Sequence, residues 1–477
     1  RRTKILATIG PASDNEATLR GMIAAGMDAV RLNLSHGTVE EALVLHARVR
    51  ALAKEMGRPI GTLVDLPGPK IRAASFGRDG VELPDGHRVR LVPDRDHSDA
   101  AVIGVEYDSL LEGIEPGDRI AFGDGAIDAE VVEASGEGLE AVVLHGGRLT
   151  GKPGVHIPSE RLRINTPTPE DLRILDAFVG VGVDMVAISF VRSAHDVRRL
   201  GTEPHPRGPL VVAKIETRSA VDNLAGILDA AGAVMIARGD LGIECPIEEL
   251  PHLQKHIIRE CIAHGRPAIT ATQMLESMVR AATPTRAEAS DVANAVFDGS
   301  SAVMLSGETA TGSDPVNVIA TMARLCARAD ENFDVDNWTR MVTRLSVEDP
   351  ESGRGHIRRV TDTMTDAAWR VAQELDAKAI LCLTRTGFTV RAIARFRPRT
   401  AILGFTPDER VRQQLSISWG ATALTLSAFA ENEEMVREAV QVARDGGHVR
   451  MGDMVVVLAG VDGRSSTTDV LRVIRVT

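Results

Sequence analysis

A short apolar segment followed by an amphipathic segment recurs along the first two thirds of the chain. The apolar runs are rich in β-branched residues and end in Gly, Ser, Thr or a charge, which is typical of a strand that leads into a helix. Eight such strands are predicted, at residues 4–8, 28–34, 60–65, 184–189, 210–215, 233–237, 267–272 and 302–305. Eight βα units favour a closed parallel (β/α)8 barrel, a TIM barrel, whose carboxyl strand ends carry the chemistry. A doubly wound sheet would have fewer strands and a glycine-rich dinucleotide turn.

Two further patterns divide the chain. Residues 68–152 hold short alternating segments split by Gly, Pro and Asp, which predict a small β domain inserted after the third strand, where it would cover the barrel mouth as a lid. A polar stretch at residues 346–359 predicts a linker, and helix and strand patterns alternate beyond it. The predicted units are a barrel (1–67 and 153–345), an inserted β lid (68–152) and a C-terminal α/β domain (346–477).

Composition limits the classes of function. A net charge of −11 disfavours a nucleic-acid partner, because a phosphate backbone needs a basic face. No apolar run is long enough to cross a membrane, the first residues lack the apolar core of a signal peptide, and the four cysteines lack paired spacing. We therefore expect a cytoplasmic protein without a membrane partner. Only seven lysines stand against 48 arginines, so a lysine indicates specific chemistry better than usual.

Charged residues at the predicted strand ends indicate a site for a divalent cation. Lys214 and Glu216 are two residues apart, hence on the same side of one strand, and Asp240 follows the next strand in a glycine-rich turn. Two carboxylates without a nearby His or Cys suit Mg²⁺ or Mn²⁺, with positions left open for substrate oxygens. Taken singly, each residue is more often a structural ion pair or a turn residue, but their shared location favours the metal.

Other strand ends carry groups suited to an anion. The apolar run around Lys214 argues for burial, where an ammonium stabilises developing negative charge. Arg31 lies in an otherwise apolar strand and is expected to meet an anion, with an internal salt bridge as the alternative. Thr272 and Ser306 follow the last two strands and alone would be helix caps.

In the C-terminal domain, the hydroxyl-rich turn 385–389 suits a phosphate cradle and an ordinary helix cap equally well.

Several long motifs, all in order, resemble the pyruvate kinase family from Thr3 to the C-terminus. They cover residues 3–13, 31–37, 236–244, 271–277, 290–295 and 304–310. The resemblance implies a metal-dependent enzyme that transfers the phosphoryl group of phosphoenolpyruvate to ADP, leaving pyruvate and ATP. It also implies a homotetramer.

The resemblance implies roles for individual residues. Glu216 and Asp240 would hold the divalent ion, Mg²⁺ or Mn²⁺. Lys214 and Arg31 would neutralise the transferring phosphoryl group, and Lys214 would also steady the enolate. Arg72 would reach the phosphoryl group or the nucleotide, and water held by Thr272 and Ser306 would protonate enolpyruvate. Contacts to the substrate would come from Arg31, Ser189, Lys214, Arg238, Gly239, Asp240 and Thr272. Such chemistry needs mostly positioning and charge neutralisation.

Two departures from the family pattern modify this expectation. Many members have Thr and Glu where this chain has Leu66 and Lys70, and the Glu form goes with a requirement for K⁺. An ammonium at Lys70 can supply that charge, so we expect activity without K⁺, although the residues that resemble the monovalent-cation ligands remain: Asn33, Ser35, Asp65 and Leu66. Pro153 replaces one of two lysines near the ADP phosphates, which leaves the preferred nucleotide open; Lys152 would compensate by turning inward as the lid closes.

The C-terminal domain resembles the family's regulatory domain. A phosphate loop for an effector is implied at Thr384, Arg385, Thr386, Gly387 and Thr389, and a loop that closes over a sugar phosphate at residues 460–467. A sugar phosphate or AMP is the expected effector. The rival interpretations are a metal-dependent aldolase or lyase of the same barrel class, and a metabolite sensor without turnover. The first would not be expected to combine the lid, Lys214 and a third domain, and the intact Lys214, Glu216, Asp240 and Thr272 argue against the second.

Overall fold

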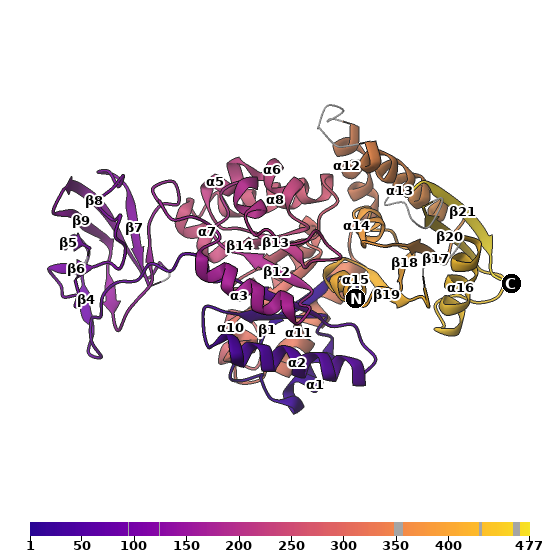
Figure 1. The fold of residues 1–477 in the computed structure, drawn as a ribbon, viewed down its shortest axis with the longest axis horizontal. Coiled ribbons are helices and arrows are strands. Elements are labelled where there is room, and N and C mark those ends of the chain that lie inside the picture. The colour runs from indigo at the N-terminus through magenta and orange to yellow at the C-terminus, as the bar shows by residue number, and fades with distance from the viewer. Residues whose placement is uncertain (94, 124, 348–355, 429–431, 461–467) are drawn as a thin grey trace.

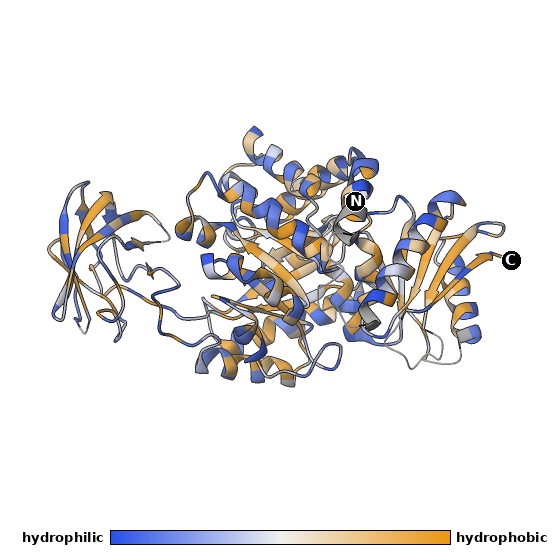
Figure 2. Cartoon of the chain, turned by 90° about the horizontal axis from the view of Figure 1, so that it is seen from above, coloured by the Kyte–Doolittle hydropathy of each residue, from blue (hydrophilic) through white to orange (hydrophobic). Residues whose placement is uncertain are grey.

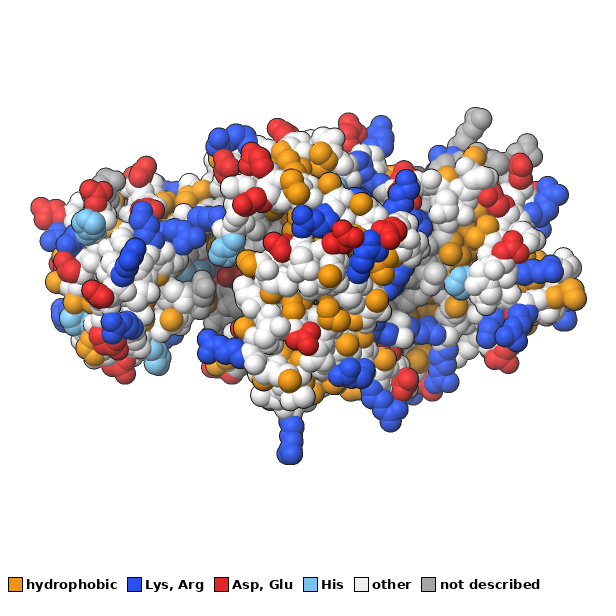
Figure 3. Space-filling model, turned by 90° about the horizontal axis from the view of Figure 1, so that it is seen from below, with side chains coloured by type: hydrophobic (Ala, Val, Ile, Leu, Met, Phe, Trp, Pro, Cys, Tyr) orange, Lys and Arg blue, Asp and Glu red, His pale blue; other side chains and the backbone are white. Residues whose placement is uncertain are grey.

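Three bodies lie in a row in the computed structural model (Figure 1). The structure describes residues 1–477 except 94, 124, 348–355, 429–431 and 461–467. An all-β body is at one end, the barrel is central, and an α/β body that contains the C-terminus is at the other end. On the face drawn in Figure 3, acidic and basic side chains are interspersed over all three bodies.

Eight parallel strands close the central barrel, which confirms the predicted fold. The strands are β1 (Lys4–Thr8), β2 (Ala29–Asn33), β3 (Gly61–Asp65), β12 (Met185–Ile188), β13 (Leu210–Ile215), β14 (Ala233–Ala237), β15 (Ala268–Ala271) and β16 (Ala302–Leu305). Their order around the barrel is β1, β16, β15, β14, β13, β12, β3, β2, so the first strand pairs with the last. Most strand residues are buried, because one side faces the barrel interior and the other faces helices. The strands are accordingly mostly hydrophobic in Figure 2.

Amphipathic helices surround these strands. Thr38, Thr168 and Thr285 each begin a helix with a capping box, in which the threonine and an acidic residue three positions on satisfy free backbone amides. The helices are α1 (Glu16–Ala25), α2 (Val39–Glu55), α3 (Pro169–Gly180), α4 (Ala194–Arg198), α5 (Arg218–Asp222), α6 (Leu224–Ala230), α7 (Arg238–Glu244), α8 (Leu250–Ala263), η1 (Glu276–Val279), α9 (Arg286–Asp298), α10 (Gly307–Ala310) and α11 (Pro315–Glu331).

A separate β body is inserted between β3 and α3. Its strands are β4 (Val81–Leu83), β5 (Arg88–Val92), β6 (Val102–Gly104), β7 (Arg119–Phe122), β8 (Ile127–Ser135), β9 (Gly138–His145), β10 (Gly147–Leu149) and β11 (Val155–His156). Six of them form one sheet in the order β11, β7, β8, β9, β5, β6, while β10 pairs with β4. The sheet has its own apolar core, which includes Leu91, Ile120 and Val131.

The C-terminal body is a five-stranded sheet with helices. Its elements are α12 (Val335–Val347), α13 (His356–Glu374), β17 (Ala379–Leu383), α14 (Phe388–Ala394), β18 (Ala401–Thr406), α15 (Glu409–Gln414), η2 (Leu415–Ile417), β19 (Ala421–Thr425), α16 (Asn432–Asp445), β20 (Met454–Ala459) and β21 (Val470–Arg475). The order is β19, β18, β17, β20, β21, with β21 antiparallel. The half-exposed strand β19 was not predicted from the sequence. The domain boundaries at 67/68, 152/153 and 345/346 stay predictions.

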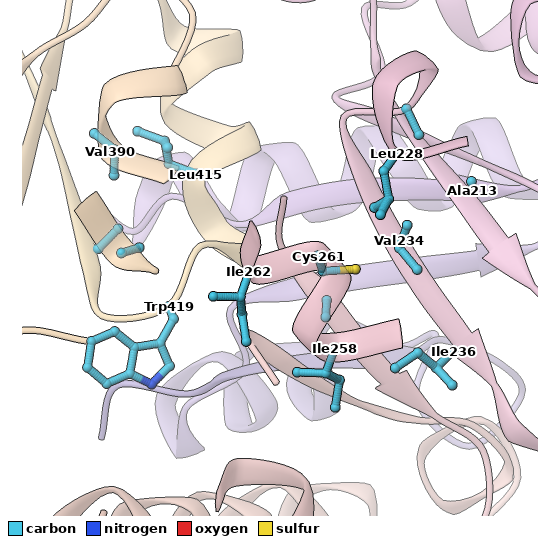
Figure 4. Packing of buried hydrophobic residues seen from close by; sticks show 14 of the residues in the cluster. Ala213, Leu228, Val234, Ile236, Ile258, Cys261, Ile262, Val390, Leu415 and Trp419 are labelled. Atoms are coloured by element: carbon cyan, nitrogen blue, oxygen red, sulfur yellow. The ribbon is translucent and has the colours of Figure 1, made fainter. Parts of the chain in front are cut away.

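Apolar packing continues from the barrel into the C-terminal body. Ile258 and Ile262 of α8 belong to the same buried cluster as Val390, Leu415 and Trp419, and Figure 4 shows Trp419 beside Ile262. The two bodies therefore share a core at the end of the barrel that faces away from the lid. Within the described residues, no helix combines the length and apolarity that a membrane crossing requires.

Candidate active site

The carboxyl ends of the barrel strands gather most of the residues that the sequence singled out. They are Arg31 and Asn33 (β2), Asp65 (β3), Ser189 (after β12), Lys214 and Glu216 (β13 and the next residue), Asp240 (after β14), Thr272 (after β15) and Ser306 (after β16). Helix α7 starts directly after β14, so the glycine-rich turn expected around Asp240 is the first turn of a helix.

The ammonium group of Lys214 lies at the centre of this cluster. Its Nζ donates a hydrogen bond to Oγ of Ser189 at 2.7 Å and lies 3.1 Å from Oε2 of Glu216 and 3.6 Å from Oδ1 of Asp65. Only 12% of the Lys214 side chain is exposed, as its apolar strand predicted. The short distance to Glu216 follows from the period of a strand, which sends residues two apart to the same side.

The charges of the site are coupled. Burial alone would lower the pKa of Lys214, but Asp65, Glu216 and Asp240 raise that pKa above its ordinary value. Burial raises the pKa of Glu216 although Lys214 acts against it, and Asp240 and Asp65 add to the increase. Asp240 is therefore close enough to act on both groups. Together, the carboxylates of Asp65, Glu216 and Asp240 carry more negative charge than the Lys214 ammonium carries positive charge. A bound cation would offset this excess.

The donor set fits a divalent cation. Oε1 of Glu216 accepts the amide of Phe190 at 2.6 Å, whereas Oε2 of Glu216 and Oδ1 of Asp65 are buried and accept no hydrogen bond from the described residues. The described part of the chain holds no cluster of three or more His, Cys, Asp or Glu arranged for a metal. Two carboxylates, Glu216 and Asp240, would leave several coordination positions for oxygens of substrate and water, as Mg²⁺ commonly has.

A strained turn follows β15. Thr272 and Gln273 have φ values of 68° and 53°, in the left-handed region that is costly for residues with a Cβ. The guanidinium of Arg238 holds the turn, because it donates to the carbonyl of Thr272 at 2.6 Å and pairs with Asp291 at 2.8 Å. Oγ1 of Thr272 accepts the amide of Gly239 at 2.9 Å. The side chain of Arg238 thus positions Thr272 against the start of α7.

The remaining hydroxyls at the barrel mouth differ in their partners. Ser189 accepts from Lys214 and donates to the carbonyl of Leu66 at 2.7 Å. Ser306 precedes α10, and its Oγ is buried without a hydrogen-bond partner in the described structure. Ser306 does not cap α10 with its hydroxyl, so the ordinary explanation for a Ser at a strand end does not account for it. The Thr272 hydroxyl does accept an amide from the first turn of a helix, but the helix is α7, which follows a different strand.

Arg31 forms the internal salt bridge that was left open as an alternative. Its Nε donates to Oδ2 of Asp65 at 2.6 Å, and its Nη1 donates to Oγ1 of Thr8 at 3.2 Å. The guanidinium is largely buried, with 12% of the side chain exposed. Arg31 nevertheless lies at the barrel mouth near Lys214, because the carboxylate of Asp65 contacts both side chains.

An ammonium lies beside the loop that resembles a monovalent-cation site. Nζ of Lys70 donates to the carbonyl of Ser35 at 3.2 Å, and Oδ1 of Asn33 accepts the amide of Ser35 at 3.2 Å. Burial lowers the pKa of Lys70, and Arg72 lowers it further, while Asp171 raises it. The carbonyl of Leu66 is already bonded to Ser189. The structure thus brings Lys70 together with Ser35, as the charge-substitution hypothesis needs.

The two lid residues proposed for the nucleotide contact each other. Nη1 of Arg72 donates to the carbonyl of Lys152 at 3.1 Å, and Nζ of Lys152 lies 2.5 Å from Oε1 of Glu106. Both Lys152 and Glu106 are about half exposed. The ammonium of Lys152 is therefore engaged within the lid, away from the cluster around Lys214.

Comparison with known proteins gives one consistent answer. The model of "Pyruvate kinase, barrel domain" matches residues 1–319, and that of "Pyruvate kinase, alpha/beta domain" matches residues 362–474. The chain belongs to the pyruvate kinase family. Pyruvate kinase of Bacillus licheniformis is 38% identical over 99% of this chain and 80% of its own length, and that of Mycobacterium tuberculosis is 36% identical over 100% of this chain and 98% of its own length.

Solved structures agree with the sequence relatives. A pyruvate kinase from Cryptosporidium parvum superposes with a TM-score of 0.91 at 30% identity, covering 100% of this chain and 96% of the other. The chain is therefore an enzyme of the pyruvate kinase family, a transferase of glycolysis, and the resemblance found in its sequence is confirmed. Enzymes of this family use a divalent metal such as Mg²⁺ and act on phosphoenolpyruvate and ADP.

The loop predicted to hold an effector lies between β17 and α14. Oγ1 of Thr384 accepts the amide of Gly387 at 2.9 Å, and Oγ1 of Thr386 accepts the amide of Phe388 at 3.3 Å. Thr389 is buried and shares a hydrogen bond of 2.6 Å with Thr468. Residues 461–467 of the second loop implied for a sugar phosphate lie outside the described residues.

Sequence reasoning missed two residues that organise the site. Phe190 has a φ of 54° and supplies the amide that Glu216 accepts, and nothing in the sequence signals that backbone conformation at a phenylalanine. Glu244 ends α7 and accepts hydrogen bonds from His156 and Ser159 of the segment that returns from the lid. The signal available in the sequence was the position of the Glu244 carboxylate on the apolar side of a short helix.

Proposed function

We propose that this chain transfers the phosphoryl group of phosphoenolpyruvate to ADP at the mouth of its barrel. The observation that carries the proposal is the position of the Lys214 ammonium, which lies 3.1 Å from Oε2 of Glu216 and is bonded to Ser189. A raised pKa keeps Lys214 charged, so it can neutralise a phosphoryl group in transfer and then the enolate oxygen left behind. Arg31, fixed by Asp65, adds a second positive charge on the same side.

Glu216 and Asp240 are the proposed ligands of the divalent cation, Mg²⁺ or Mn²⁺. When bound there, the cation would neutralise the carboxylate and phosphoryl charges of the substrate. Arg238, Gly239 and Thr272 would position the substrate carboxylate, since Arg238 fixes the turn at Thr272 and the Gly239 amide faces the Thr272 hydroxyl. Ser306, whose buried hydroxyl accepts and donates no hydrogen bond among the described residues, is suited to hold the water that protonates enolpyruvate.

On the lid, Arg72 and Lys152 are the proposed contacts to the nucleotide, with Lys152 released from Glu106 when the lid closes. Lys70 is proposed to replace K⁺, because its ammonium already contacts Ser35. Thr384, Arg385, Thr386, Gly387 and Thr389 are proposed to bind the phosphate of a regulatory sugar phosphate or AMP. Assembly as a homotetramer and a cytoplasmic location are part of the same proposal.

A coupled assay of pyruvate formation with ADP and Mg²⁺ or Mn²⁺ tests the proposal. Lys214→Met is expected to lower kcat by about 10³-fold or more, the order found when a group that stabilises developing charge is removed. Lys255→Met is the matched control, because Lys255 is half exposed and pairs with Asp298 on a barrel helix. Equal activity of the Lys214 variant and the wild type would refute the assignment. A wild type that forms no pyruvate would favour the metabolite sensor.

Effector binding has a separate test. Replacing Thr384 and Thr389 by Val is expected to abolish activation by a sugar phosphate or AMP while leaving the unstimulated rate unchanged, because both lie in the C-terminal body, at the end of the barrel opposite the inserted β body. Intact responses to every effector would reject this part of the proposal alone.

A further inference from the structure

Four arginines meet at the interface between the barrel and the C-terminal body. Arg391 lies on α14, Arg395 and Arg397 follow it, and Arg266 comes from the loop between α8 and β15. All four line one small cavity of about 20 Å³, which has room for on the order of one water-sized particle. Among the described residues that line the cavity, none is acidic. Buried positive charge is costly unless it is paired, so each guanidinium needs a partner.

Three of these guanidinium groups have visible partners. Arg397 donates to the carbonyls of Val296 and Ser300 at 3.0 and 2.6 Å and lies 4.6 to 5.0 Å from the rings of Phe333, Trp338 and Trp419. Arg395 pairs with Asp362 at 3.0 Å. Arg266 donates to the carbonyl of Leu228 at 3.0 Å.

Arg391 differs from the other three. Its Nη2 donates to the carbonyl of Thr386 at 2.7 Å and to Nε2 of His205 at 3.1 Å. Its Nε and Nη1 are buried and have no hydrogen-bond acceptor in the described part of the chain, although the residue is only 3% exposed. Ser418, which lines the same cavity and is 1% exposed, likewise has a hydroxyl without a partner in the described residues.

The charge of Arg391 cannot be removed by losing its proton. Burial lowers the pKa of Arg391 to about 10, which still leaves the guanidinium charged at neutral pH. Burial and the nearby Arg391 and Arg266 lower the pKa of His205 to about 3, so His205 stays neutral and can only accept the hydrogen bond through Nε2. A charged guanidinium with two nitrogens that have no hydrogen-bond acceptor among the described residues therefore indicates a missing acceptor that carries negative charge.

We propose that this cavity binds one small inorganic anion of the size of chloride, held by Nε and Nη1 of Arg391 with the hydroxyl of Ser418 as a further donor. The free space suits a halide and is too small for a sugar phosphate or a nucleotide. No residue of the loop at 384–389 lines the cavity, although Nη1 of Arg391 lies beside Gly387 of that loop. Because Arg391 also bonds Thr386 and His205, a bound anion would fix the contact between that loop and the barrel.

Thermal unfolding tests the proposal. The measurement is made at constant ionic strength while sodium chloride is replaced by sodium gluconate, whose anion is too large for the cavity. The wild type is expected to show a Tm that rises with chloride and then saturates, as for a ligand that binds only the folded state. Arg391→Met should remove the dependence. Arg78→Met, at an exposed lid position, should keep it. Equal Tm values of the wild type in both salts would overturn the proposal.

Crystals grown in sodium bromide give a direct second readout. An anomalous peak beside Arg391 in the wild type, lost or weakened in Ser418→Ala, is the expected result. The Ser418 variant keeps all four guanidinium groups, so it serves even if Arg391→Met does not fold. Density of a water molecule without an anomalous signal would show that the cavity holds water alone and would overturn the proposal.

Discussion

Nε2 of His156 lies 2.9 Å from Oε1 of Glu244, and this contact joins the returning end of the lid to the helix that carries Asp240. Glu244 also accepts hydrogen bonds from the amide and the hydroxyl of Ser159, both at 2.8 Å, and from the amide of Arg218 at 3.1 Å. Burial alone would raise the pKa of Glu244, but His156 and the other donors lower it. One ionised carboxylate therefore links the lid, α7 and the start of α5.

The first prediction concerns this link. Glu244→Gln should lower kcat/KM for ADP by about 10-fold or more, because an amide cannot accept all four hydrogen bonds and each bond to a charged group is worth about 1.5–3 kcal/mol. Steady-state kinetics with ADP as the varied substrate measure the effect. Glu248→Gln, at an exposed position on the same segment, is the control and should behave as the wild type. Equal kinetics of the two variants would show that Glu244 does not couple the lid to the site.

The second prediction concerns protons and metal at Glu216. Burial raises the pKa of this carboxyl, so protons compete with a cation at higher pH than at an ordinary glutamate. The affinity of the wild type for Mn²⁺, followed by electron paramagnetic resonance without substrate, should fall as pH decreases below neutrality, approaching tenfold per pH unit once Glu216 is protonated. Glu216→Gln should bind weakly at every pH and lose this dependence. Mn²⁺ affinity that is the same from pH 8 to pH 5 in the wild type would contradict the role of Glu216.

The third prediction concerns Lys70. If its ammonium replaces K⁺, the wild type should be fully active with tetramethylammonium as the monovalent cation, and Lys70→Glu should become dependent on added K⁺. The reason is electrostatic. In Lys70→Glu the carbonyl of Ser35 loses the ammonium of Lys70 that contacts it in the wild type, and K⁺ would have to supply that positive charge. Lys54→Glu, on the exposed end of α2, controls for a change in net charge. A wild type that needs K⁺ would reject the hypothesis.

Sequence alone predicted the barrel because its strands are buried on both faces and read as continuous apolar runs. It also predicted that Lys214 and Glu216 share one side of β13, because a two-residue period fixes the direction of side chains. It did not show that Arg238 bonds the turn at Thr272, since that contact joins two different strand ends and depends on left-handed backbone angles. The half-exposed strand β19 was not predicted because its alternation of apolar and polar residues is interrupted. The neighbouring strand β18 supplies its hydrogen bonds, which the sequence does not show.

Lid residues were the hardest to place. Lys152 was expected near the nucleotide, and the structure shows it paired with Glu106, a residue that no sequence pattern singled out. Ion pairs between half-exposed residues of different strands or loops leave no periodic signal in a sequence. They are also weak, typically below about 1 kcal/mol, so the pair can open when a phosphate competes for the ammonium.

That weakness leads to the fourth prediction. Glu106→Gln should lower KM for ADP by a few-fold, because Lys152 no longer has to leave a carboxylate before it meets the nucleotide. Lys152→Met should raise the same KM. The double variant should match Lys152→Met, since removing Glu106 has no effect once the ammonium is absent. Additive effects of the two substitutions would show that Glu106 acts on ADP by another route.

The fifth prediction concerns stability and pH at His46. This side chain is 4% exposed and packs edge-on against the ring of Phe178, and burial together with Arg50 lowers its pKa to about 4. The unfolded chain, with an ordinary histidine pKa of about 6.5, binds more protons than the folded chain between these values. The free energy of unfolding should therefore decrease as pH falls from about 6.5 toward 4, by at most about 1.4 kcal/mol per pH unit from this group. Urea unfolding of the wild type and of His46→Gln, which stays neutral, isolates the contribution. Parallel pH profiles of the two proteins would show that His46 titrates normally.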